Sequence, residues 1–88
     1  MRFTVERNEG IVIFTLKSPK LTSENSANMK AELLIVCQPD ISALVIDLTL
    51  VDFVDSSGLG ALLLAYRQLK DHDILTMATY PTSYSDLR

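Results

Sequence analysis

The sequence has few of the residues that build disulfides or metal sites. Cysteine and histidine each occur once, as Cys37 and His72. A single cysteine excludes an internal disulfide, and one cysteine with one histidine argues against a metal site. We therefore expect no metal and no cofactor. Cys37 follows Ile35 and Val36 and is predicted to occupy a core position.

Basic residues are also in the minority. Lys and Arg number 8 against 11 Asp and Glu, which gives a net charge of −3. No basic face is available for a phosphate backbone, so we expect no direct nucleic-acid partner. The sequence has no apolar run long enough to span a membrane and no secretory leader pattern at its N-terminus. These absences favour a cytoplasmic protein.

The apolar residues that are present suffice for one small folded domain. The chain has 88 residues, of which 48% are hydrophobic and 22% charged, a globular composition. A domain of this size buries only about 60% of the surface of its unfolded chain, so its stability should be modest. We find no internal repeat or domain boundary.

Four segments have the pattern of β-strands. Residues 2–7 alternate polar and apolar, and residues 11–16 are apolar on both faces. The turn residues between them predict a hairpin whose second strand is the more central. Further strands are predicted at residues 43–48 and 74–79. We expect Asp47, near the end of its strand, to accept backbone N–H groups rather than to act in catalysis.

Two helices are predicted between these strands. The first covers residues 21–37, with Thr22 or Ser23 as its cap. The residues away from its polar face, which form its apolar arc, are Ala27, Ala31, Leu33 and Leu34. The order of elements predicts an α/β fold: a mixed β-sheet with helices packed on it, built from parallel, right-handed strand–helix–strand units. A further helix is predicted to begin near Pro81.

The second helix is predicted over residues 57–70. Leu59, Leu62, Leu63 and Tyr66 follow one another at the i, i+3, i+4 and i+7 spacing of an amphipathic helix. This spacing predicts that Leu62 and Leu63 face the core. On that basis, Leu63→Ala should cost about 2–5 kcal/mol of stability.

The chain is organised around Asp55-Ser56-Ser57-Gly58-Leu59-Gly60, between a buried strand and this second helix. Asp and Ser are residues that cap a helix N-terminus, and the glycines allow another group to come close. Two interpretations are open. The stretch is either a capped helix with small residues packed on a strand, or it presents a serine hydroxyl for chemistry at the positive end of the helix. A phosphate would be favoured at that end.

The same stretch resembles the signature of the STAS domain, the family of bacterial anti-sigma factor antagonists. The resemblance rests on residues 54–60, with Asp47-Leu48 upstream and Arg67 and Lys70 downstream. In that family the first serine after the aspartate is the usual phosphorylation site, which implies phosphorylation of Ser56. The residues that the resemblance assigns to partner binding are Asp55, Ser57, Gly58, Leu59 and Thr22.

The sequence departs from the family's pattern at three places. The usual Leu-Asp before the first helix reads Leu21-Thr22, which keeps a capping hydroxyl but lacks the carboxylate. Asp71-His72-Asp73 stands where a glycine-rich loop is usual. The chain also stops early, so we expect a STAS-like domain over residues 1–88 without the usual last strand and helix. Its uncovered sheet should promote self-association, or else gain order from a partner.

The resemblance implies an anti-sigma factor antagonist that acts by partner switching. The unphosphorylated form would bind an anti-sigma factor of serine-kinase type and so release the sigma factor. The kinase would phosphorylate Ser56 and end the binding, and a serine phosphatase would reset it. The alternative is a non-switching STAS scaffold, or an accessory subunit of a membrane transporter for lipids or anions.

An enzyme would need a base beside the serine. His72 lies at the far end of the predicted helix, about 20 Å from Ser57 at about 1.5 Å per residue. The G-x-S-x-G pattern is absent, because Val54 and Asp55 precede the serine. We therefore expect no enzymatic activity.

Overall fold

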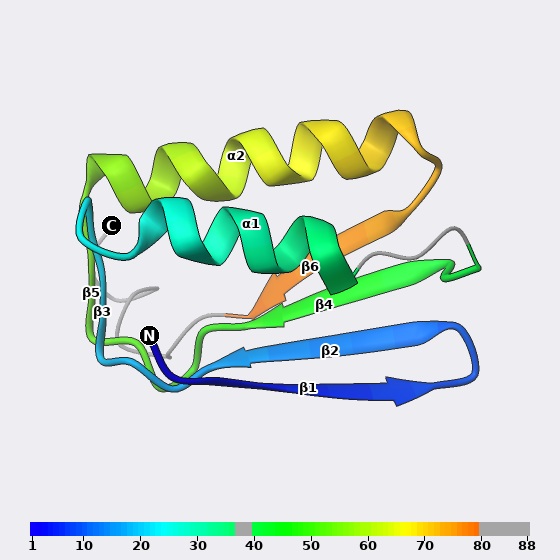
Figure 1. The fold of residues 1–88 in the computed structure, drawn as a ribbon, viewed down its shortest axis with the longest axis horizontal. Coiled ribbons are helices and arrows are strands. Elements are labelled where there is room, and N and C mark those ends of the chain that lie inside the picture. The colour runs from blue at the N-terminus through cyan, green and yellow to red at the C-terminus, as the bar shows by residue number, and fades with distance from the viewer. Residues whose placement is uncertain (37–39, 80–88) are drawn as a thin grey trace.

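The computed structural model describes residues 1–36 and 40–79. Its elements, in chain order, are β1 (Phe3–Asn8), β2 (Ile11–Leu16), β3 (Lys20–Leu21), α1 (Ser26–Val36), β4 (Ala43–Asp47), β5 (Phe53–Val54), α2 (Ser56–Asp71) and β6 (Leu75–Thr79). Figure 1 shows α1 and α2 side by side over one face of the main sheet. Cys37 and the helix expected after Pro81 lie outside the described residues.

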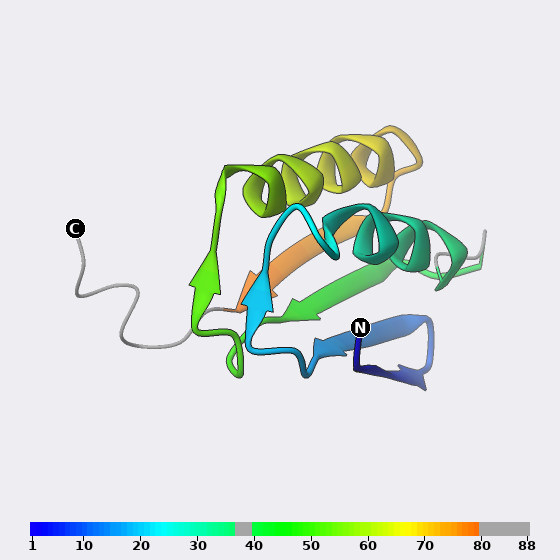
Figure 2. The same ribbon diagram turned by 60° about the vertical axis from the view of Figure 1, so that its left-hand side comes forward.

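Two sheets are present. The main one has four strands in the order β1-β2-β4-β6, and β3 and β5 form a second, two-stranded sheet. Figure 2 shows that this small sheet stands at one end of the main sheet and rises toward the start of α2. No helix in the described residues has the length and apolarity to cross a membrane.

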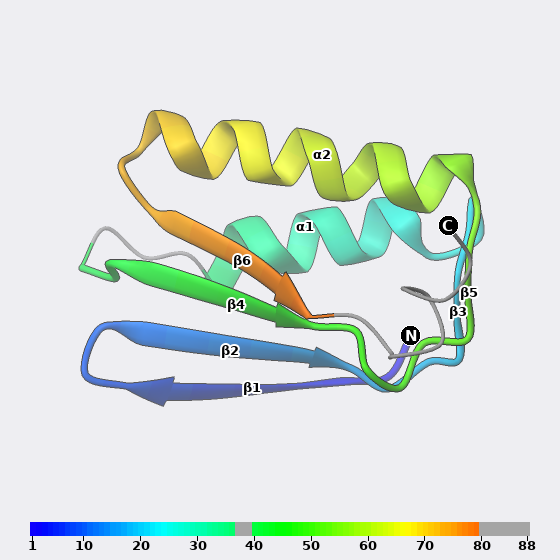
Figure 3. The same ribbon diagram turned by 180° about the vertical axis from the view of Figure 1, so that it is seen from behind.

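The predicted mixed sheet is confirmed. β1 and β2 form the antiparallel hairpin, and β2–β4 and β4–β6 are parallel pairs joined by α1 and α2 (Figure 3). β2 lies inside the sheet, as its apolar sequence predicts. The core forms between the sheet and the helices, where alternate side chains such as Val12, Phe14 and Leu44 are fully buried.

Helix α1 begins later than the sequence predicts. It starts at Ser26 instead of residue 21, because Leu21 pairs with β5 and the next residues form a turn. In that turn the Thr22 hydroxyl accepts from the Glu24 N–H, and Asn25 Oδ1 accepts from the Thr22 N–H at 2.9 Å. The predicted cap residue therefore stabilises the turn before the helix and not the helix itself.

The apolar arc predicted for α1 is also largely wrong. Of its members only Leu33 is buried, whereas Ala27, Ala31 and Leu34 are exposed. The residues that the helix buries are Ser26, Met29, Leu33 and Val36. Apolar residues surround most of this helix, so spacing alone did not select the face that meets the sheet.

Helix α2 has nearly the predicted bounds but a different buried face. Leu62 is buried as expected, whereas Leu59, Leu63 and Tyr66 are exposed. The residues that α2 buries are Gly58, Ala61, Leu62, Ala65 and Leu69. The prediction for Leu63 is therefore wrong. The buried residues of α2 follow one another at helical spacing, as do the residues of the row predicted from the sequence. The buried row is the one with small side chains, which let α2 pack closely on its neighbours.

The turn after α2 places Asp73 in a left-handed conformation. The Asp73 N–H donates to the Lys70 carbonyl and the Ile74 N–H donates to the Leu69 carbonyl, the pair of bonds of a Schellman motif. Asp73 has φ of 60°, a left-handed conformation that aspartate tolerates better than most residues. The turn therefore ends α2 cleanly before β6.

Asp47 ties the ends of two parallel strands together. Its Oδ1 accepts from the Thr49 hydroxyl at 2.7 Å, from the Thr49 N–H at 3.0 Å and from the Thr79 hydroxyl at 3.0 Å. The hydrogen bonds from Thr49, more than that from Thr79, hold the pKa of the Asp47 carboxyl below its ordinary value. The expected bonding at the strand end is confirmed for one backbone N–H, that of Thr49, whereas the other two donors are hydroxyls.

We expect Asp47→Asn to lower the free energy of unfolding by about 1 kcal/mol at pH 7. Because the folded-state pKa is lowered, this stabilisation is complete above the unfolded-state pKa and is lost as pH falls through the folded-state value. Urea denaturation at pH 7 and pH 3 should show the gap between wild type and variant closing in acid. An equal difference in unfolding free energy between wild type and variant at both pH values would contradict this role. Asp52→Asn, which changes an exposed carboxyl, is the matched control.

Candidate partner-binding site

Asp55 connects the two halves of the candidate site. Its Oδ1 accepts from the Gly58 N–H at 2.8 Å, which makes Asp55 the N-cap of α2; the sequence predicts a cap in the Asp55–Ser57 stretch without choosing the residue. Its Oδ2 accepts from the Ser23 N–H at 3.3 Å, and its own N–H donates to the Leu21 carbonyl at 3.1 Å. The carboxylate therefore holds the loop after β3 against the start of α2, a contact that the sequence does not reveal.

The β3–β5 pair brings that loop to this position. Lys20 lies opposite Phe53 and Leu21 opposite Val54, in parallel register. The Pro19 carbonyl accepts from the Asp52 N–H at 2.6 Å just before the pair. Strands of two residues are too short to show a periodicity, so sequence analysis missed both. A pairing between them could be found only from the tertiary structure.

Gly58 lies where the two halves touch. A Cβ atom there would lie 2.5 Å from the Leu21 carbonyl oxygen and 2.8 Å from Leu21 Cγ, closer than real Cβ atoms come. The expectation that glycine permits a close approach is therefore right for Gly58. It is wrong for Gly60, where a Cβ atom would meet nothing within 4 Å.

The loop on the other side is held in one conformation by its own hydrogen bonds. The Thr22 carbonyl accepts from the Asn25 and Ser26 N–H groups, and Asn25 Nδ2 donates to the Lys20 carbonyl at 2.8 Å. Thr22 is partly buried and its hydroxyl is engaged within the loop. These hydrogen bonds therefore fix the conformation of the loop that lies beside Asp55.

Ser56 and Ser57 are the first two residues of α2, and both are exposed. Neither hydroxyl makes a hydrogen bond with another described residue. The N–H groups of a first helical turn have no partner inside the helix, and the helix dipole makes this end positive. An unengaged hydroxyl thus stands at a position where added negative charge is tolerated.

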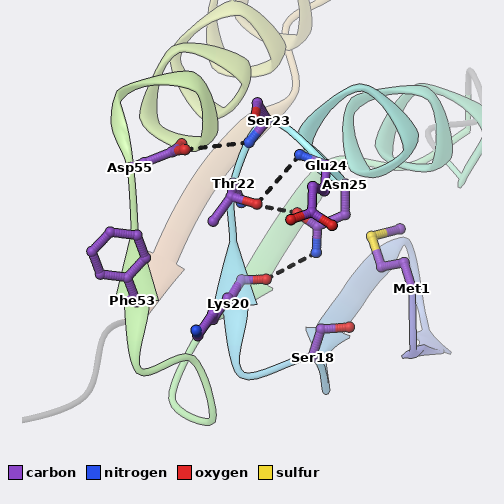
Figure 4. A pocket seen from close by; sticks show the side chains of 9 residues that line it. All are labelled: Met1, Ser18, Lys20, Thr22, Ser23, Glu24, Asn25, Phe53 and Asp55. Atoms are coloured by element: carbon purple, nitrogen blue, oxygen red, sulfur yellow. Dashed lines mark hydrogen bonds between the residues drawn. The ribbon is translucent and has the colours of Figure 1, made fainter.

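An open pocket of about 770 Å³ lies beside this helix start (Figure 4). Its lining residues are Met1, Ser18, Lys20, Thr22, Ser23, Glu24, Asn25, Phe53 and Asp55. Thr22 and Asp55 thus line a common space, whereas Ser56, Ser57, Gly58 and Leu59 lie outside it on α2. His72 stands at the other end of α2, about 24 Å from Ser56 at about 1.5 Å per residue.

Exposed apolar side chains flank the start of α2. Phe53 on β5 and Leu59 on the first turn of α2 are each about half exposed. Leu63 and Tyr66 continue the exposed row along the helix, one and two turns further on. Exposed apolar side chains beside polar residues are typical of a protein interface. Sequence analysis missed this surface because Leu59, Leu63 and Tyr66 have the helical spacing of a buried face, although the structure exposes them.

The fold and this helix start match a known family. The model of the STAS domain family covers residues 2–79. The chain belongs to the STAS domain family. The resemblance seen in the Asp55–Gly60 stretch is therefore confirmed, and the mixed α/β sheet with its helices is the fold of that family. No curated protein sequence matches the chain.

Several solved structures contain a domain similar to this STAS domain. A crystal structure of Mglu aligns with a TM-score of 0.80 at 20% identity, over 90% of this chain and 19% of that one. The murine anion transporter Slc26a9 aligns with a TM-score of 0.75 at 22% identity, over 93% of this chain and 14% of that one. This STAS domain therefore spans less than a fifth of either protein.

The anti-sigma factor antagonist SpoIIAA is closer in size. Its unphosphorylated form aligns with a TM-score of 0.71 at 21% identity, over 97% of this chain and 80% of that one. The phosphorylated form of SpoIIAA from Bacillus aligns with a TM-score of 0.68 at 17% identity, over 98% of this chain and 96% of that one. At these identities the likeness establishes the shared fold, which also occurs in a transporter.

Proposed function

We propose that this STAS domain is an anti-sigma factor antagonist whose partner binding is switched by phosphorylation of Ser56. The observation that carries the proposal is the exposed, unengaged Ser56 hydroxyl at the first position of α2, directly after the capping Asp55. The family supplies the precedent: SpoIIAA, which has the same fold, has been solved in unphosphorylated and phosphorylated forms. Ser57 is exposed too, but the family pattern favours the serine next to the aspartate.

The surroundings of Ser56 support binding by the neutral form. Phe53 and Leu59 offer apolar area on either side of the serine in the sequence, and Gly58 holds the helix start against Leu21. A partner that covers this surface would bury the Ser56 hydroxyl with it. We include Asp55, Ser57 and Thr22 in the same contact surface. A phosphoserine there adds about −1.5 to −2 charge that the interface would have to desolvate.

The same charge should leave the isolated domain folded. Ser56 is exposed, so a phosphate would stay in water, and the positive end of α2 would stabilise it slightly. Phosphorylation would therefore act on binding and not on folding. In this scheme the partner is an anti-sigma factor that is also a serine kinase, and a serine phosphatase restores the binding form. The reaction uses ATP, so the proposal places the protein in the cytoplasm.

The test is phosphosite mapping after incubation with ATP and a kinase-type anti-sigma factor, sought in the operon of this protein. We expect modification of Ser56, none in Ser56→Ala, and unchanged modification in Ser57→Ala, the matched control. Ser56→Asp should fold normally yet bind the anti-sigma factor at least about tenfold more weakly, or about 1.4 kcal/mol. Modification of Ser57 alone would move the site by one residue.

A second candidate function is supported by the likeness to the Slc26a9 anion transporter. A STAS domain in that role would be a scaffold or an accessory subunit of a membrane transporter, without a switch. In this case no kinase would modify Ser56, and binding would be indifferent to Ser56→Asp. A transporter in place of an anti-sigma factor in the operon would favour this candidate over the first.

A further inference from the structure

Among the residues that the structure describes, strand β6 is an edge of the main sheet, and its outer hydrogen-bonding side has no partner. The Leu75 N–H donates to the Ser42 carbonyl and the Thr79 carbonyl accepts from the Leu48 N–H, so these two β6 residues point their backbone groups toward β4. Backbone groups alternate sides along a strand. The N–H and C=O groups of Thr76 and Ala78 therefore point outward, where the described residues provide no further strand.

The sequence of this edge lacks the charges and prolines that often protect one. The sequence of β6, Leu-Thr-Met-Ala-Thr, has no charge, no proline and no glycine. The other edge, β1, includes Glu6 and Arg7, charges that discourage pairing. On β6, Leu75 is 62% exposed and Met77 is 52% exposed, on the sheet face away from the helices. The unprotected edge is thus also an apolar one.

We propose that β6 pairs with β6 of a second copy, antiparallel, across a two-fold axis beside Met77. Thr76 of one copy then lies opposite Ala78 of the other, and each such pair exchanges two backbone hydrogen bonds. Met77 faces its own counterpart at the axis, in a pair without hydrogen bonds whose side chains come close. The two sheets become one continuous sheet of eight strands.

The occupant is a second copy because the edge is complementary to itself. The outward groups are at Thr76 and Ala78, placed symmetrically about Met77, so one two-fold axis satisfies all of them. No like charges meet, because β6 has none. The apolar part of the contact is little more than Leu75 and Met77 of each copy, which puts the interface below about 1,200 Å². The dimer should therefore be weak and should depend on concentration.

Sedimentation velocity of the 88-residue chain from about 10 µM to 1 mM tests the proposal. We expect the weight-average mass to rise toward that of a dimer across this range. Ala78→Pro removes an outward N–H while leaving the bonds to β4 intact, and Met77→Lys puts two like charges at the axis. Both variants should remain monomeric, and circular dichroism should show that both are folded. If the proline variant does not fold, Met77→Lys alone tests the proposal.

Ile11→Lys is the matched control. Ile11 is 43% exposed on the same open face of the sheet but lies on β2, two strands away from the edge. It should dimerise like the wild type, and amide exchange at Thr76 and Ala78 should slow as concentration rises. A wild type that remains monomeric at 1 mM would overturn the proposal. A dimer that persists in Met77→Lys would also overturn it. So would loss of the dimer in Ile11→Lys to the same extent, because that result would mean that the copies associate through their sheet faces and not through their edges.

Discussion

Leu62→Ala should lower the free energy of unfolding by about 2–5 kcal/mol, whereas Leu63→Ala should lower it by less than about 0.5 kcal/mol. The two leucines are neighbours in α2, but the Leu62 side chain is 6% exposed and that of Leu63 is 57% exposed. Truncating Leu62 removes apolar contacts and leaves a cavity, while truncating Leu63 alters a surface that already faces water. In a domain of this size the first loss is a large part of the total stability.

Chemical denaturation of the two variants under the same conditions measures the difference. The pair is its own control, because residue type, helix and helix propensity are the same in both. Equal losses would mean that α2 is rotated about its axis relative to the arrangement described. If Leu63 contributes to the partner surface instead, Leu63→Ala should weaken anti-sigma factor binding while leaving stability unchanged.

The second large effect is expected at the glycines of α2. Gly58→Ala should lower the free energy of unfolding by about 1–3 kcal/mol, because the added Cβ would overlap the Leu21 backbone and either α2 or β3 must shift. Gly60→Ala should instead raise it by about 0.5–1 kcal/mol, because alanine favours the helix and the added methyl meets open space. Thermal or urea unfolding of both variants checks the opposite signs.

The consequence of Gly58→Ala should extend to binding. A shift of Leu21 would move the loop of Thr22 and Ser23, which Asp55 holds against the helix start. We therefore expect weaker anti-sigma factor binding by Gly58→Ala and unchanged binding by Gly60→Ala. Stabilisation by both alanines would contradict the close contact with Leu21, and destabilisation by both would mean that Gly60 is needed for a reason other than space.

Local patterns were sufficient to predict most elements of the fold. The apolar runs of β2 and β4 and the turn between β1 and β2 predict their strands, and strand–helix–strand order predicts parallel pairing. These predictions succeed because they depend on periodicity and on the tendency of strand–helix–strand units to place their strands in parallel, which local sequence patterns display. A helix cap within Asp55–Ser57 was likewise predictable, because a cap interacts with the helix that follows it, whereas the choice of Asp55 came from the structure.

The faces that the two helices bury could not be predicted from local patterns. In both helices more apolar residues are present than one face can hold, and the sequence offers two rows of equal spacing. The choice between Leu62 and Leu63 depends on how closely α2 approaches α1 and the sheet. That approach favours the row that contains Gly58, Ala61 and Ala65, whose small side chains let the backbones come near.

By itself the sequence determined the α/β fold, a helix start within Asp55–Ser57 and, through its motif, membership of the STAS family. Only the tertiary structure decided that β3 and β5 pair, that Gly58 touches Leu21 and that Asp55 holds Ser23. Capping and periodicity are interactions between near neighbours, which a sequence displays directly. The contacts around Asp55 join segments 32 residues apart, and these meet only when the whole sheet and both helices have packed.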